Sequence, residues 1–174
     1  YLGWRAFKGC SGLTAISIPE SVKTIGWHCF EGCSRLALVQ LDEGIKVLEN
    51  GVFSSCRSLR QVMIPASVKS LGGWMFFSCT NLRMVSFRGS VREIQERTFS
   101  GCYELEQVLI PAGLEKIGVE AFYEGTNLKH VGLPSTGKEI QRQAFTNDRY
   151  FEELVLPKSL ERLEESVFHG CFGI

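Results

Sequence analysis

The chain has 174 residues, 44% of them hydrophobic, and its 19 basic and 19 acidic side chains cancel. This composition lacks the basic face of a nucleic-acid-binding protein, and no apolar stretch is long enough to cross a bilayer as a helix. The charge is uneven along the chain, because residues 1–87 hold nine Lys/Arg against five Asp/Glu (+4) and residues 88–174 hold ten against fourteen (−4).

A phenylalanine recurs every 23 residues from one end of the chain to the other, without insertion or deletion. A fixed period of about 20–29 residues is typical of a solenoid, in which each coil is one supersecondary unit stacked on the next. We therefore predict a single repeat domain, with a partial coil at 1–12 and seven repeats over 13–173, and we interpret the chain as a fragment of a longer one. The inner spine of the stack is expected to consist of Phe7, Phe30, Phe53, Phe76, Phe99, Phe122, Phe145 and Phe168.

Each repeat opens with a short segment in which β-branched or other apolar residues alternate with variable ones, as at 15–18. This period of two predicts a strand, and stacked coils would place such strands parallel and about 4.8 Å apart. Proline follows five of the seven strands, where it removes the N–H donor that would continue the ladder. Asp42 and Arg88 take its place in the second and fourth repeats.

The return half of each repeat contains the phenylalanine that recurs every 23 residues, within a segment such as 26–33. A cysteine follows the phenylalanine by three residues in six of the eight coils. A spacing of three places two side chains on one side of a helical turn. The segment is too short for a long helix, so we expect a single α- or 3₁₀-helical turn on this side of the solenoid.

The repeated pattern is L-x-x-I-x-I-P-x-x-V-x-x-I-G-x-x-A-F-x-x-C, and it covers the whole chain. It resembles the leucine-rich repeats of the bacterial surface antigen (BspA-like) class, although the turn carries Ser, Gly or Thr where better-known leucine-rich repeats carry Asn or Cys. The resemblance implies a curved right-handed solenoid with a parallel β-sheet on its concave side and short helical turns on its convex side. It also implies recognition or adhesion at surfaces, and it favours a cell-surface or extracellular location.

The cysteines that share one column of the repeat are predicted to be buried free thiols. Equivalent side chains in a stack point the same way, and adjacent copies lie near or beyond the Cβ separation of a disulfide. A buried thiol acts as a small hydrophobic group. The cysteines of this column are Cys10, Cys33, Cys56, Cys79, Cys102 and Cys171. In the two remaining coils, Gly125 and Asp148 occupy the same position.

Only His28, Cys29 and Cys33 resemble a set of metal ligands. One His and two Cys without a second C-x-x-C pair give a weak metal signal, and Cys29 lies in a column that holds alanine in other coils. The sequence contains no nucleophile-elbow, P-loop, dinucleotide-binding or H-E-x-x-H pattern. We therefore expect no enzyme activity, no cofactor and no metal.

The variable strand positions face outward on the predicted concave side, where we place the candidate partner-binding residues. Two leucines and two methionines of four successive coils would form a diagonal apolar patch there, flanked by arginines. A contiguous apolar patch often marks a contact site, and the alternative is a solvated sheet face that tolerates mixed residues. The candidates are Leu38, Gln40, Arg60, Gln61, Met63, Arg83, Met84, Ser86, Gln107 and Leu109.

A second group of candidates is aromatic and lies on or beside the convex turns. Trp4 and Trp27 share one column, and Trp74 and Phe77 flank the spine residue of the third return segment. Packing between coils and contact with a partner are both open interpretations of these side chains.

Taken together, these patterns predict a non-enzymatic interaction module that binds another protein, with surface recognition or adhesion as its function. The alternative is an intracellular scaffold or accessory subunit of a large assembly, which agrees with a column of free thiols and the lack of an N-x-S/T sequon. No nucleic-acid partner and no insertion into a membrane are expected.

Overall fold

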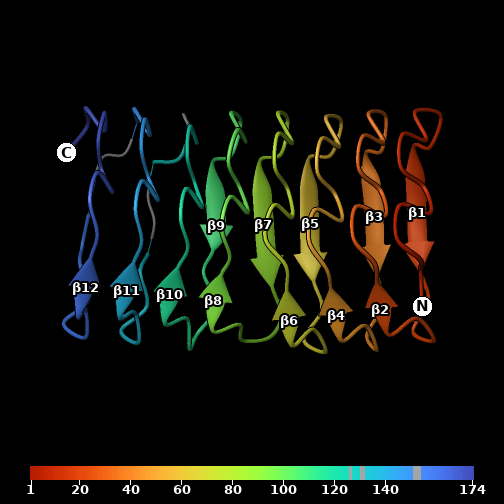
Figure 1. Cartoon of the computed structure of the whole chain (residues 1–174), viewed down its shortest axis with the longest axis horizontal. Helices are drawn as coiled ribbons and strands as arrows, with labels where there is room; N and C mark the ends of the chain where they lie inside the picture. Colours follow the sequence, from red (N-terminus) through yellow and green to blue (C-terminus); the bar gives the residue numbers. More distant parts are fainter. Residues whose placement is uncertain (126, 130–131, 151–153) are drawn as a thin grey trace.

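The computed structural model describes residues 1–174 with the exception of 126, 130–131 and 151–153. Its coils stack side by side along one axis, and the two chain termini lie at opposite ends of the stack (Figure 1). The 23-residue period also places His130, Val131, Phe151 and Glu153 in columns of the repeat, but these four residues lie outside the described part of the chain.

One side of the stack consists of parallel strands, one from each of five successive repeats. Their register follows the 23-residue period, so that Ile16 pairs with Val39 and Val62 pairs with Val85. Buried residues alternate with outward-facing ones along each strand, as the period of two predicts. We call this side, the expected concave side, the strand face; it contains β1 (Ala15–Ile18), β3 (Leu38–Leu41), β5 (Gln61–Ile64), β7 (Met84–Phe87) and β9 (Gln107–Leu109).

A second row of two-residue strands runs in the opposite direction to the first (Figure 1). Neither row is one continuous sheet: within the described part of the chain, no ladder joins β3 to β5 in the first row or β6 to β8 in the second. The second row contains β2 (Thr24–Ile25), β4 (Val47–Leu48), β6 (Ser70–Leu71), β8 (Glu93–Ile94), β10 (Lys116–Ile117), β11 (Glu139–Ile140) and β12 (Arg162–Leu163).

The segments around the phenylalanines form the third side, which we call the turn face. The expected α- or 3₁₀-helical turn is absent from the described residues, which form non-helical turns there. Each segment contains two residues with positive φ, for example His28 (54°) and Gly32 (72°), and a left-handed residue interrupts a right-handed helical path. The spacing of three between phenylalanine and cysteine is nevertheless a hydrogen-bonded turn, since the Cys33 N–H donates to the Phe30 carbonyl at 3.1 Å.

Backbone N–H groups of the turn face alternate between two kinds of acceptor. The Cys29 N–H donates to the Gly26 carbonyl three residues earlier, whereas the Phe30 N–H donates to the Val52 carbonyl of the next coil at 2.9 Å. The bonds between turn segments all run one way among the described residues, with the earlier coil donating and the later coil accepting. The turn face is therefore a second set of bonds that joins each coil to the next.

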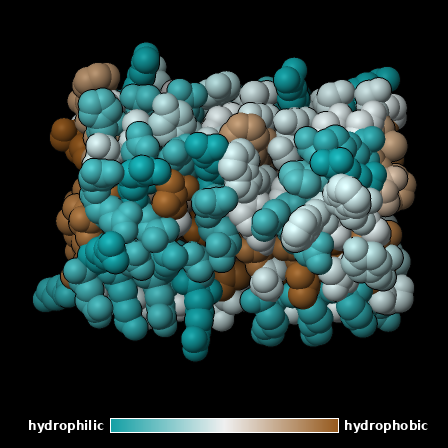
Figure 2. Space-filling model, in the orientation of Figure 1, coloured by the Kyte–Doolittle hydropathy of each residue, from teal (hydrophilic) through white to brown (hydrophobic). Residues whose placement is uncertain are grey.

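The phenylalanine column forms the predicted spine. Successive ring centroids lie 5.0–5.9 Å apart with their planes within 5–19° of parallel. The six central rings are fully buried, while Phe7 and Phe168 at the ends of the stack are partly buried. On the outer surface, hydrophobic residues form separate patches between hydrophilic ones (Figure 2).

All seven cysteines are free thiols, and six of them are buried. Each buried thiol of the repeat column donates to the phenylalanine carbonyl of the preceding coil, for example Cys79 Sγ to Phe53 O at 3.0 Å. Burial raises the pKa of the Cys171 thiol to about 11 and also raises the pKa of the other buried thiols of the column, so these thiols stay protonated and able to donate. The prediction of buried thiols is wrong for Cys10, which is exposed because its coil is the first of the stack and has no earlier coil to cover it.

Candidate partner-binding surface

The strand face presents the two variable columns of the repeat to solvent. Leu38 is 58% exposed, Met63 48% and Leu109 47%, while Met84 is partly exposed. The register places these four residues on alternate columns of successive strands, so they form a zigzag rather than a straight diagonal. Diagonal neighbours on one sheet face lie about 7–8 Å apart, within reach of long side chains. We call this row the apolar zigzag.

A hollow of about 540 Å³ opens at the end of β3 and β5 where the chain leaves the strands. Its apolar wall includes Leu38 and Met63, the first two members of the apolar zigzag. Its charged rim contains both residues that replace proline in the repeat, Asp42 and Arg88, together with two glutamates. We call it the acidic hollow, because three acidic side chains line it against one basic one. These charged residues are Glu20, Asp42, Glu43 and Arg88.

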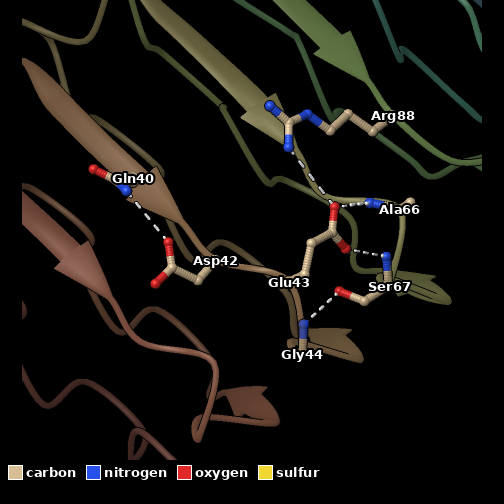
Figure 3. A network of polar contacts seen from close by, with 7 residues as sticks. All are labelled: Gln40, Asp42, Glu43, Gly44, Ala66, Ser67 and Arg88. Atoms are coloured by element: carbon tan, nitrogen blue, oxygen red, sulfur yellow. Dashed lines mark hydrogen bonds and ion pairs between the residues drawn. The ribbon is translucent and has the colours of Figure 1, made fainter.

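Glu43 organises the rim of the acidic hollow (Figure 3). Its carboxylate accepts hydrogen bonds from the backbone N–H groups of Ala66 (3.1 Å) and Ser67 (3.0 Å) of the next coil, and Arg88 lies 4.0 Å away. These bonds, the one from Ala66 above all, lower the pKa of Glu43, which is therefore ionised at neutral pH. The Ser67 hydroxyl accepts from the Gly44 N–H at 2.9 Å, so the two turns hold each other in place.

A second hollow, of about 490 Å³, lies at the opposite end of the same strands. It also contacts Leu38, and it is bordered by Arg60 and Arg83. Arg83 lies 3.8 Å from Glu104 and 4.0 Å from Glu106, at distances typical of loose surface pairs. We call it the basic hollow; it is lined by Ala37, Leu38, Arg60, Gln61, Arg83, Met84, Glu106 and Gln107.

The structure thus brings most of the predicted residues together around the two hollows. Leu38, Gln40 and Met63 border the acidic hollow, whereas Ser86 and Leu109 lie beyond both. The acidic rim was not among the predicted residues, although the replacement of proline by Asp42 and Arg88 was the signal that could have revealed it. Both hollows lie beside the break between β3 and β5.

The residues that resemble metal ligands do not converge on one point. Cys29 is buried in the core, Cys33 donates its thiol proton to the Phe7 carbonyl, and the His28 Nδ1 lies 3.1 Å from Glu31. Among the described residues, no three His, Cys, Asp or Glu side chains are placed to hold a metal ion. In the same part of the chain, no helix has the length and apolarity needed to cross a membrane.

The repeat family is settled by comparison with family models. The model described as "BspA type Leucine rich repeat region" matches residues 1–124 and 51–174, with six copies. The chain belongs to the BspA-type leucine-rich repeat family. Members of this BspA-type family are generally protein-interaction or surface proteins.

Solved structures of bacterial leucine-rich repeat proteins share the BspA-type fold of this chain. A leucine-rich repeat protein from Eubacterium ventriosum is 29% identical with a TM-score of 0.85, over 90% of this chain and 42% of its own. The Treponema protein described as "T. pallidum Leucine Rich Repeat protein" is 30% identical with a TM-score of 0.56, over 72% of this chain and 70% of its own. The chain therefore spans less than half the length of the Eubacterium protein. Comparison with curated proteins gave no match.

Proposed function

We propose that this BspA-type chain is a non-enzymatic module that binds another protein through the strand face, in surface recognition or adhesion. The observation that carries this proposal is the apolar zigzag between two hollows of opposite charge. Apolar side chains at the centre of a patch with charged ones at its rim are the usual composition of a protein interface. The family supports an interaction role in general, and the strand-face residues supply the specific surface.

The two hollows predict the charge pattern of the partner. A partner segment that lies across β3 and β5 would place basic groups toward Glu43 and Asp42 and acidic groups toward Arg60. Arg60 is exposed at the mouth of the basic hollow and available to pair with such a group. Complementary charge of this kind orients a partner and speeds its association, and the effect weakens as salt screens it.

The experiment compares two triple variants of the full chain in binding to intact bacterial and epithelial cells, measured by flow cytometry. The test variant changes Leu38, Met63 and Met84 to serine. The matched control changes Trp4, Trp27 and Tyr150 to serine, since these side chains are 55–61% exposed and lie outside both hollows. Circular dichroism confirms that both variants remain folded.

We expect saturable binding of the unmodified chain, at least tenfold weaker binding of the strand-face variant, and unchanged binding of the control. Equal binding by the folded strand-face variant would exclude the strand face as the contact surface. Loss of binding in the control variant instead would move the contact to the aromatic residues. Absence of saturable binding to any cell surface would overturn the adhesion role.

A further inference from the structure

The turn face contains a third hollow, of about 420 Å³, that is separate from the strand-face surface. Two aromatic side chains, Phe77 and Tyr123, border it at positions of one repeat column that hold Ser54, Ser100 and Thr146 in neighbouring coils. The Ser and Thr of neighbouring coils show that the repeat itself does not need an aromatic residue in this column. Phe77 packs on Trp74, with ring centroids 5.0 Å apart and planes tilted by 53°, and both Phe77 and Tyr123 stay partly exposed. Partly exposed aromatic side chains that border a hollow offer a contact surface for a ligand.

The hollow results from the alternation of large and small residues along the stack. Phe77 and Tyr123 are two coils apart, which corresponds to roughly 10 Å at the spacing of stacked strands. The coil between them contributes Ser100, which is only 4% exposed, and Gly101, which has no side chain. A notch therefore lies between two aromatic walls. Its width is about that of one six-membered ring in van der Waals contact with both walls.

Polar groups complete the other two walls. On one side the Arg97 guanidinium donates to the Glu120 carboxylate at 2.7 Å, and it also lies 4.6 Å from the centre of the Trp74 ring, which fixes its position. On the other side the Tyr103 hydroxyl lies 3.5 Å from the Glu124 carboxylate. Planar carboxylates and a planar guanidinium in fixed positions suit a ligand that carries several adjacent hydroxyl groups.

We propose that this turn-face hollow binds one ring of a neutral carbohydrate. A sugar ring has C–H faces that pack on aromatic side chains and hydroxyl groups around its edge that reach the carboxylates and the guanidinium. The volume of about 420 Å³ lies within the range of small-molecule sites. An anion is disfavoured because two carboxylates border the hollow against one guanidinium, which is itself paired with Glu120. A cation is the alternative that the choline probe below tests.

The test titrates the full chain with named neutral probes, maltohexaose, laminarihexaose and tri-N-acetylchitotriose, and follows binding by tyrosine and tryptophan fluorescence and by calorimetry. Choline chloride serves as the cationic probe and sialyllactose as the anionic one. We expect at least one neutral oligosaccharide to bind with a Kd on the order of 1 mM or tighter, which is a modest affinity for a shallow site. Phe77→Ala and Tyr123→Ala should each weaken that binding at least tenfold, whereas Trp27→Ala, at an exposed aromatic residue elsewhere, should leave it unchanged.

Glu124→Gln gives a second measurement that does not depend on the aromatic residues, since it alters one polar wall with little change of shape. Weaker binding of the same oligosaccharide by this variant would support the proposal. Three results would overturn it: no binding of any neutral probe at 10 mM or below, binding that survives both aromatic substitutions in folded protein, or a preference for choline or sialyllactose. The site is distinct from the strand face, so the strand-face serine variant should retain the carbohydrate affinity.

Discussion

A buried carboxyl group interrupts the column of thiols at Asp148, and its replacement by cysteine should stabilise the protein in a pH-dependent way. Asp148 has no exposed surface, and neither carboxyl oxygen accepts a well-formed hydrogen bond from the described residues, since the nearby Gly125 N–H donates to the Phe122 carbonyl at 2.9 Å. It fits because the equivalent residue of the preceding coil is glycine: a Cβ on Gly125 would lie 2.9 Å from Asp148 Oδ1. Burial raises the pKa of Asp148 to about 9.

The sign and size of the effect follow from this shift. An aspartate in the unfolded chain has a pKa of about 3.9, so between pH 4 and pH 9 the folded state holds a proton that the unfolded state has lost. The stability that this group contributes is fully present below about pH 4 and is lost as the pH rises toward 9. Each pH unit costs up to about 1.4 kcal/mol, which gives at most about 4 kcal/mol at pH 7.

Asp148→Cys removes this cost and restores the repeat. The new thiol lies 26 residues after Phe122, the same spacing at which Cys102 Sγ donates to the Phe76 carbonyl at 3.1 Å. We expect the gain in unfolding free energy to be up to about 3 kcal/mol larger at pH 7 than at pH 4.5, in addition to a pH-independent gain from removing the unpaired carboxyl oxygens. Urea unfolding followed by circular dichroism, with m-values compared between variants, measures it.

Glu106→Gln, at an exposed carboxyl, is the matched control and should show no such pH dependence. An equal gain at both pH values would refute the reasoning, because it would mean that Asp148 is ionised in the folded protein or that the gain comes from packing alone.

Two further predictions test the spine and the thiol column. Phe99→Ala should lower the unfolding free energy by roughly 1–2 kcal/mol more than Phe7→Ala, because Phe99 is fully buried between two coils and Phe7 is only partly buried at the end of the stack. Equal losses in urea unfolding would contradict a stack whose ends are weakest. In the native protein a thiol reagent should modify Cys10 rapidly and the other cysteines only after denaturation, since Cys10 is the exposed one. Fast modification of several thiols under native conditions would show that the column is open to solvent.

The parts of the fold that the sequence predicted are those in which every coil makes the same contact. The spine rings and the buried strand positions recur because each packs against the equivalent position of the next coil. The period alone therefore locates them. The thiol column was predicted as apolar, but its bonds to phenylalanine carbonyls were not, although the 26-residue offset between Phe53 and Cys79 is visible in retrospect.

The turn geometry and the hollows could not be read in the same way. Left-handed residues recur at two fixed positions of each turn segment, but one of these positions holds Arg5, His28, Trp74 and Glu120 in different coils. None of these residue types favours positive φ as glycine does, so this position carries no consistent signal of the conformation. The other position holds Gly9, Gly32, Gly101 and Gly170, and these glycines were the signal that could have revealed it. The hollows are formed by residues from coils two apart, such as Asp42 with Arg88 or Phe77 with Tyr123. That such residues border the same hollow is visible only when the register of the coils is known.

The one-way hydrogen bonds of the turn face have an electrostatic consequence for that face. Each bond aligns a peptide dipole with the long axis, its carbonyl end directed toward the first coil, so the dipoles of successive coils add as they do in an α-helix. The first coil becomes the negative pole of this backbone dipole and the last coil the positive pole. The side chains are distributed in the opposite sense, with excess positive charge in residues 1–87 and excess negative charge in residues 88–174. Bonds along the two strand rows run the other way, for example from the Asp42 N–H to the Ile18 carbonyl. The uneven side-chain charge of a chain that is neutral overall thus offsets the polarity of the turn face in particular.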